Sequence, residues 1–292
     1  MNSMKLEVEI FRILSAFGIV WFHSGMETGR SIAYGGLIFF SIVTTYFATI
    51  STRTHSFFNR LERVVIPFFL WGIFYGVINL LFKGSVFPEH YMLLSKILAS
   101  PSIHLWFLPF IFLSHVIVDN FKQVMSREWF ATMIGVTVII LISTAPIWRG
   151  FDYYRPLGQY AHVLPAVLIG IFFGGIRNIR DNIRVIVNIG IFISIMVMTI
   201  MHQSGVGITY LVGMIPCIFL FVGHTINNND SFLFKISSAT FGVYLLHPFA
   251  LKVLRYLEFD GWLLPFLAFF SSLIIVMSLK TVAPKKYIKY LV

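Results

Sequence analysis

Ten long apolar stretches dominate this sequence and restrict what the chain can fold into. A helix needs about 20 apolar residues to cross a bilayer, and most of the stretches approach that length. They are predicted at residues 6–26, 31–51, 64–82, 103–121, 129–147, 162–176, 183–201, 206–223, 234–255 and 262–283. The segments between them are short. We therefore expect an all-α integral membrane protein, with ten transmembrane helices in one bundle and no separate soluble domain over residues 1–292.

The composition excludes the soluble classes of protein. Charged residues make up 12% of the chain, whereas soluble domains carry about 25%. A surface with so few charges cannot be solvated, so the bilayer is an expected partner. The net charge of +10 lies in short loops between apolar spans, which favours membrane orientation over nucleic-acid binding. The single cysteine, Cys217, cannot form an intrachain disulfide.

The basic residues predict that both termini are cytoplasmic. With the N-terminus inside, the inner segments hold fourteen Lys and Arg residues and the outer loops hold seven. An excess of cytoplasmic Lys and Arg is the usual arrangement. The inner residues are Lys5, Arg53, Arg60, Arg63, Lys122, Arg127, Arg177, Arg180, Arg184, Lys235, Lys280, Lys285, Lys286 and Lys289.

Two ionisable residues lie at the ends of the stretch RILSAFGIVWFH in the first span. Arg12 and His23 are eleven residues apart, so on a helix they differ by only about 20° in direction and about 16 Å in depth. They are predicted to share one face, with Arg12 near the inner surface and His23 in the outer part. Glu27, one helical turn further on, is predicted to hold the His23 ring by a hydrogen bond. Taken singly, Arg12 could be a snorkelling arginine and His23 an interfacial histidine. Together on one face they favour a functional path.

Further candidate residues lie in four other segments. In RLER, Arg60 and Arg63 are spaced to present two guanidinium groups to one polyphosphate at the inner face, although ordinary positive-inside charge explains them better when the motif is taken alone. His104 and Trp106 open the fourth span, where an aromatic belt is the alternative. His247 lies inside the ninth span, where a histidine needs a partner.

The outer loop WRGFDYYRP contains Tyr154 and Arg155, which suit stacking on a sugar and hydrogen bonding to it. A plain interfacial loop is an equal alternative. The sequence contains no Walker A motif, no HExxH and no Cys/His cluster, so no metal site is predicted.

These residues resemble the motifs of acyltransferase family 3, integral-membrane enzymes that include O-acetyltransferases of bacterial surface polysaccharides. The pair Arg12 and His23 is similar to the family signature of an arginine, ten residues and a histidine. RLER, HLWFL and YLLH resemble three further family segments, in the expected order and with the expected number of spans. The second span departs from the family pattern, because Thr44 and Thr45 stand where a Ser-Gly pair is usual.

The resemblance implies an acyltransferase that moves an acyl group, expected to be acetyl, from acetyl-CoA to a glycan hydroxyl. The glycan would be O-antigen, capsule, exopolysaccharide or a lipid-linked sugar, and the enzyme would lie in the bacterial inner membrane. Arg60, Arg63 and Arg12 would bind the donor; His247, His104, Trp106, Tyr154 and Arg155 would bind the acceptor.

The implied reaction leaves the role of His23 open. His23 would act as general base on the acceptor hydroxyl, or as a nucleophile that forms an acyl-histidine. Glu27 would orient its ring and Arg12 would position the donor or stabilise negative charge. The alternative function is a transporter or exporter of a lipid-linked glycan or small solute.

Overall fold

The computed structural model describes residues 6–51, 57–176, 179–222, 231–284, 288 and 290. All regular secondary structure in these residues is helical, which confirms the predicted fold class. The chain divides into two compact units, residues 1–40, 199–290 and 292 in the first and residues 41–198 and 291 in the second. Each unit is described by itself, and the prediction of a single membrane domain stays a prediction.

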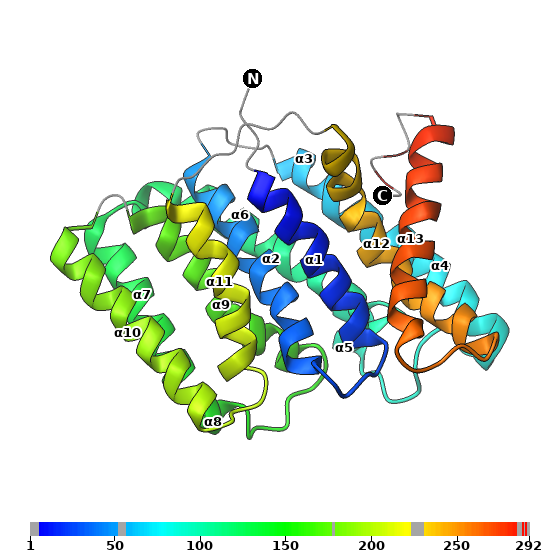
Figure 1. Ribbon diagram of the computed structural model, residues 1–292, viewed down its shortest axis with the longest axis horizontal. Helices are drawn as coiled ribbons and strands as arrows, with labels where there is room; N and C mark the ends of the chain where they lie inside the picture. Colours follow the sequence, from blue (N-terminus) through cyan, green and yellow to red (C-terminus); the bar gives the residue numbers. More distant parts are fainter. Residues whose placement is uncertain are drawn as a thin grey trace. The chain divides into compact units, whose positions relative to one another are not determined.

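Unit 1 contains the N-terminal and C-terminal helices. Its elements are α1 (Leu6–His23), the first half of α2 (Arg30–Ile50), α11 (Gly207–Val222), α12 (Ser231–Tyr256) and α13 (Leu263–Val282). Helix α1 contacts α11, α12 and α13. The start of α1 and the end of α13 lie at the same end of the unit (Figure 1), as an even number of spans requires.

Unit 2 contains the second half of α2 and the helices that follow it. They are α3 (Phe57–Arg60), a π-helical turn (Leu61–Val65), α4 (Ile66–Lys83), α5 (Leu93–Ala99), a 3₁₀ turn (Ile103–Trp106), α6 (Phe107–Met125), α7 (Glu128–Ser143), α8 (Ala145–Trp148), α9 (Leu157–Gly175) and α10 (Asp181–Ile200), whose last two residues fall in unit 1.

Each of the ten predicted spans is occupied by a helix. Within the part of the chain that the structure describes, six helical segments are long and apolar enough to cross a membrane: Arg30–Ile50, Phe57–Lys83, Ile103–Met125, Leu157–Gly175, Asp181–Ile200 and Leu263–Val282. Two shorter apolar helices, Glu128–Ser143 and Gly207–Cys217, add to them. The chain is therefore a multi-pass membrane protein. The remaining two spans, α1 and α12, contain more polar residues, and they carry Arg12, His23 and His247.

The orientation of the helices across the membrane stays a prediction. Six of the inner basic residues on which it depends, Lys5, Arg53, Arg177, Lys285, Lys286 and Lys289, lie outside the described residues.

Two threonines of the second span, Thr45 and Thr49, pack against glycines of α9 within unit 2. A Cβ atom at Gly170 would overlap the Thr45 hydroxyl, and one at Gly174 would lie 2.5 Å from the Thr49 Cβ. Thr45 Oγ1 also donates a hydrogen bond to the Val167 carbonyl at 3.2 Å. Small residues let membrane helices approach closely. Here α9 supplies them, so α2 packs tightly without the Ser-Gly pair.

Candidate active site

Helices α1 and α12 run parallel along one interface of unit 1 and carry polar residues at both ends of it. Near their N-termini, Ser237 Oγ donates a hydrogen bond to Glu9 Oε2. Near the C-terminus of α1, the rings of His23 and His247 lie 5.1 Å apart, centroid to centroid. Both helices therefore advance in the same direction from the first contact to the second (Figure 1).

The two histidines meet at the end of α1. His247 is fully buried, and its Nδ1 lies 2.7 Å from the Tyr244 carbonyl and 3.3 Å from the Val243 carbonyl. A carbonyl oxygen only accepts hydrogen bonds, so Nδ1 carries the proton and Nε2 is the basic nitrogen of the neutral ring. His23 is half-buried beside it. A backbone-held imidazole next to a second imidazole suits proton transfer.

A hydrogen bond joins the same two helices just beyond the histidines. The guanidinium of Arg255, at the end of α12, donates from Nη2 to the Ser24 carbonyl at 2.7 Å. Gly25 follows with a φ of 81°, a conformation that glycine adopts at little cost. Helix α1 therefore stops at His23, and Arg255 helps to fix where its last residue lies.

The predicted role of Glu27 depended on a helix that continues past His23, and that helix is not present. Because α1 ends at His23, Glu27 lies in the following loop and its side chain is 91% exposed. Its carboxylate lies 3.8 Å from the Arg30 guanidinium. The expected hydrogen bond between Glu27 and the His23 ring is therefore wrong.

Arg12 lies at the other end of α1 within a group of charged and hydroxyl residues. Its Nη1 donates to Glu9 Oε2 at 3.1 Å, and the Glu9 side chain is only 12% exposed against 34% for Arg12. Lys280 of α13 lies close enough to Arg12 to interact electrostatically and donates to Ser238 Oγ at 3.2 Å. Arg12 thus faces the same α12–α13 side of the unit as His23, in agreement with the expected shared face.

The two arginines of RLER have different environments in unit 2. Arg60 forms an ion pair with Asp119 of α6, and both side chains are nearly buried. Arg63, on the π-helical turn, is exposed. Asp119 therefore holds one of the two guanidinium groups, and the expected presentation of both to one polyphosphate stays a prediction.

The first three residues of HLWFL are buried in the 3₁₀ turn that precedes α6. His104 Nδ1 lies 2.8 Å from Ser102 Oγ, and its ring meets that of Tyr75 edge-on at 5.0 Å. Trp106 lies 5.8 Å from the Tyr160 ring. The His104 and Trp106 side chains are both buried, and their expected contact with the acceptor stays a prediction.

Tyr154 and Arg155 are exposed on the loop between α8 and α9. Ser95 of α5 donates a hydrogen bond to the Arg155 carbonyl, which fixes the loop backbone and leaves both side chains open. Their expected contact with the acceptor stays a prediction.

The sequence analysis did not identify the carboxylates that pair with Arg12 and Arg60, which are Glu9 and Asp119. Glu9 precedes Arg12 by three residues, a spacing at which helical side chains meet, so its contact was readable. Asp119 is distant in sequence from Arg60, and only the fold brings them together.

The comparison with known families decides the assignment. A model described as the acyltransferase domain, of acyltransferase family 3, matches residues 5–281. The chain belongs to the acyltransferase 3 family. It is therefore a multi-pass membrane acyltransferase, which takes an acyl donor and an acyl acceptor. No curated protein and no solved structure matched the chain. Among the described residues, no three or more His, Cys, Asp or Glu side chains are grouped to hold a metal ion.

Proposed function

We propose that this acyltransferase transfers an acetyl group from acetyl-CoA to a hydroxyl of an exported cell-envelope glycan, in the bacterial inner membrane. The observation that carries the proposal is the placement of His23 beside His247, at the opposite end of α1 from the Arg12–Glu9 pair. An acyltransferase needs a base near the acceptor and cations near the donor, and we assign these roles to His23 and Arg12 of α1.

In this proposal His23 accepts the proton of the acceptor hydroxyl while that oxygen attacks the thioester carbonyl. The carbon–sulfur bond then breaks, the ester forms, and the CoA thiolate takes the proton from His23. His247 lies against His23, and in this proposal its Nε2 accepts a hydrogen bond from the charged His23 ring, which stabilises that form. General-base catalysis by a positioned histidine is worth about 10²–10⁴-fold in rate.

The donor is assigned to the cations at the predicted inner face. Arg63 is the exposed arginine of RLER and contacts the CoA phosphates, whereas Arg60 holds the third and fourth spans together through Asp119. Arg12, with part of its guanidinium exposed, positions the donor along α1. On the predicted outer side, Tyr154 and Arg155 contact the glycan.

The test is donor consumption by purified protein in liposomes. Radiolabelled acetyl-CoA should release free CoA and label a glycan fraction from the host only when both substrates are present. Replacement of Arg63 by Ala should raise the KM for acetyl-CoA, because its guanidinium binds ground state and transition state alike. Movement of glycan across the liposome without donor consumption would instead identify a transporter.

A further inference from the structure

Two neighbouring serines of α12 hold charged residues of α1 and α13 together within unit 1. Ser237 Oγ donates a hydrogen bond to Glu9 Oε2, and the same carboxylate oxygen accepts one from Arg12 Nη1 at 3.1 Å. The next serine, Ser238, accepts a hydrogen bond at its Oγ from Lys280 Nζ at 3.2 Å, and a second one at its carbonyl. Arg12 and Lys280 are therefore held next to the same short stretch of α12.

This group of residues carries more positive than negative charge. Its carboxylate, Glu9, forms an ion pair with Arg12. Lys280 lies close enough to Arg12 to interact with it electrostatically, yet within the described part of the chain it forms no ion pair with a carboxylate. Two cations held together away from bulk water repel each other unless an anion joins them. The charges of this site are therefore complementary to a phosphate group.

Both cations remain accessible to a ligand. The Arg12 side chain is 34% exposed and Lys280 is half-buried, whereas the Glu9 side chain is only 12% exposed. Glu9 therefore fixes the guanidinium from the buried side and leaves part of its N–H groups open. Since a guanidinium and an ammonium group only donate hydrogen bonds, an acceptor such as a phosphate oxygen suits the open positions.

The distance from this site to His23 matches the length of the pantetheine arm of CoA. Arg12 and His23 are eleven residues apart on α1, which is about 16 Å along a helix. The arm joins the pyrophosphate to the sulfur through about thirteen bonds, and an extended chain advances about 3.3–3.6 Å for every three bonds, so the arm spans about 15 Å. A phosphate at Arg12 therefore brings the thioester close to His23. A free phosphate or a lipid head group at the same place would leave this match of lengths without a reason.

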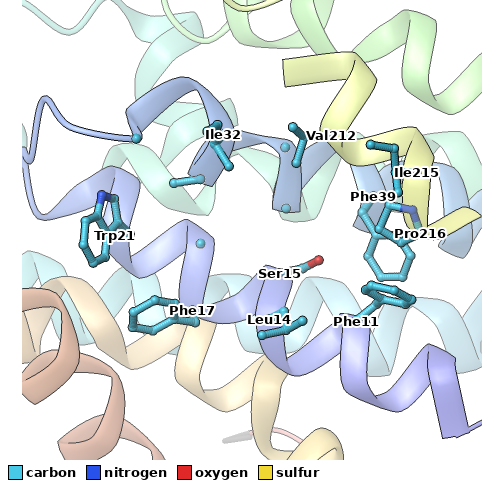
Figure 2. Close-up of a pocket in the computed structure, with 15 residues that line it drawn as sticks. Phe11, Leu14, Ser15, Phe17, Trp21, Ile32, Phe39, Val212, Ile215 and Pro216 are labelled. Carbon is cyan, nitrogen blue, oxygen red and sulfur yellow. The ribbon is translucent and has the colours of Figure 1, made fainter. Parts of the chain in front are cut away.

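The arm is expected on the side of α1 that carries both residues, because the opposite side is apolar. Leu14 and Trp21 lie about 160–180° from Arg12 around the helix, whereas His23 lies only about 20° from it. They line a groove of about 460 Å³ between α1, the first half of α2 and α11, where Figure 2 shows apolar side chains along both walls. Among the described residues that line this groove, only Ser15 carries a hydroxyl group. The groove therefore offers few partners to the amide groups of the arm.

We infer that Lys280 and Arg12 together bind the phosphate at the start of the donor's phosphopantetheine arm. The inference rests on the proposed function and adds Lys280, a residue of α13, to the donor site. The two cations hold the phosphate, while Glu9 and the two serines keep the cations in place. The arm then runs along α1, and its thioester lies at His23.

Binding of CoA fragments to the full chain in phosphatidylcholine nanodiscs tests this site without turnover. Titration calorimetry compares the affinities for CoA, dephospho-CoA, 4′-phosphopantetheine and pantetheine. Lys280→Gln removes the charge, and its amide still donates a hydrogen bond to Ser238. The variant should bind the three phosphate-containing probes about tenfold more weakly, since a hydrogen bond between charged groups is stronger than one with a neutral donor. It should bind pantetheine as the unchanged protein does.

The matched control is Lys235→Gln, which removes one positive charge from the first turns of α12. Lys235 is exposed and lies three residues before Ser238. Its replacement should leave all four affinities unchanged, and Lys280→Arg, which keeps the charge, should retain most of the affinity for CoA. An equal loss of CoA affinity in Lys235→Gln and Lys280→Gln would show a general attraction of anions to this end of the unit, and it would overturn the inference.

Three other results would also overturn it. The first is weaker binding of pantetheine by Lys280→Gln, which would show a change in the shape of the site. The second is weaker binding of CoA without weaker binding of dephospho-CoA and phosphopantetheine, which would place Lys280 on a different phosphate. The third is unchanged CoA affinity together with a loss of copurified phosphatidylglycerol, which would assign the phosphate to the bilayer.

Acetyl transfer by the unchanged protein is measured beside binding, so that the two proposals are separated. CoA binding that depends on Lys280, without any transfer from acetyl-CoA, would remove the proposed function alone. Transfer from acetyl-CoA, with equal CoA binding by the unchanged protein and Lys280→Gln, would remove this inference alone.

Discussion

The ion pair between Glu9 and Arg12 yields the sharpest prediction about the donor end of α1. In Glu9→Gln the side chain keeps its size, and its amide oxygen still accepts the hydrogen bond from Ser237. What is lost is the charge opposite Arg12, 3.1 Å away. A hydrogen bond between charged groups contributes about 1.5–3 kcal/mol and a neutral one about 0.5–1.5.

Replacing the charged hydrogen bond between Glu9 and Arg12 by a neutral one should therefore weaken this contact by about 1 kcal/mol, once the one-third exposure of Arg12 is taken into account. If Glu9 acts by positioning Arg12 on the donor, kcat/KM for acetyl-CoA should fall about fivefold, and the change should lie mainly in KM. Glu9→Ala removes both hydrogen bonds and should cost about 2 kcal/mol, which is about thirtyfold. The assay is release of free CoA by protein in liposomes over a range of donor concentrations.

A double-mutant cycle separates positioning from a general effect on the fold. When Arg12 has already been replaced by Ala, the further change Glu9→Gln should produce no additional loss, because Gln keeps the hydrogen bond from Ser237 and the charge of Glu9 acts only through Arg12. Additive losses would refute the reasoning. The matched control is Glu128→Gln, which breaks a solvent-exposed pair with Arg180 and should leave kcat/KM unchanged.

Three further predictions concern packing and burial. Cys217 is 1% exposed, so a thiol-reactive dye should label it only as the protein unfolds. Labelling of the unheated protein would contradict the burial of the Cys217 side chain. With this readout, Gly170→Val should lower the unfolding temperature, since overpacking a tight contact costs about 1–3 kcal/mol, whereas Gly158→Ala, which meets only an ordinary contact with Tyr153, should not. Asp119→Asn leaves Arg60 without its carboxylate and should lower the unfolding temperature by more than Glu128→Gln does, because breaking a nearly buried pair costs about 3 kcal/mol or more.

The fold was predictable because membrane insertion forces long apolar helices, and length and hydropathy are read directly from the sequence. All ten spans were placed, although α9 begins at Leu157, five residues before the predicted start. The shift has a local reason. The segment LGQYAH is too polar to be included by hydropathy, yet it forms helix because Tyr160 packs against Trp106 and Phe110.

The sequence predicts only those parts of the site that lie on a single helix, because residue spacing fixes directions and distances within one helix but not between helices. The separation of Arg12 and His23 on α1 follows from residue spacing, and Glu9 could have been found in the same way. The approach of His247 to His23 depends on α12 and has no local signal. Glu27 was misplaced because the positive φ at Gly25 ends the helix. The two glycines of the sequence SGMETG indicate such a helix end.

The central claim is that His23 performs the chemistry of acyl transfer, and its replacement tests that claim most directly. Purified His23→Ala in liposomes should lose at least about a hundredfold in the rate of transfer from labelled acetyl-CoA, while His90→Ala, which removes an exposed loop histidine, keeps the normal rate. Both variants should show the same Cys217 labelling temperature as the unchanged protein. A His23→Ala protein that is folded and fully active would contradict the account.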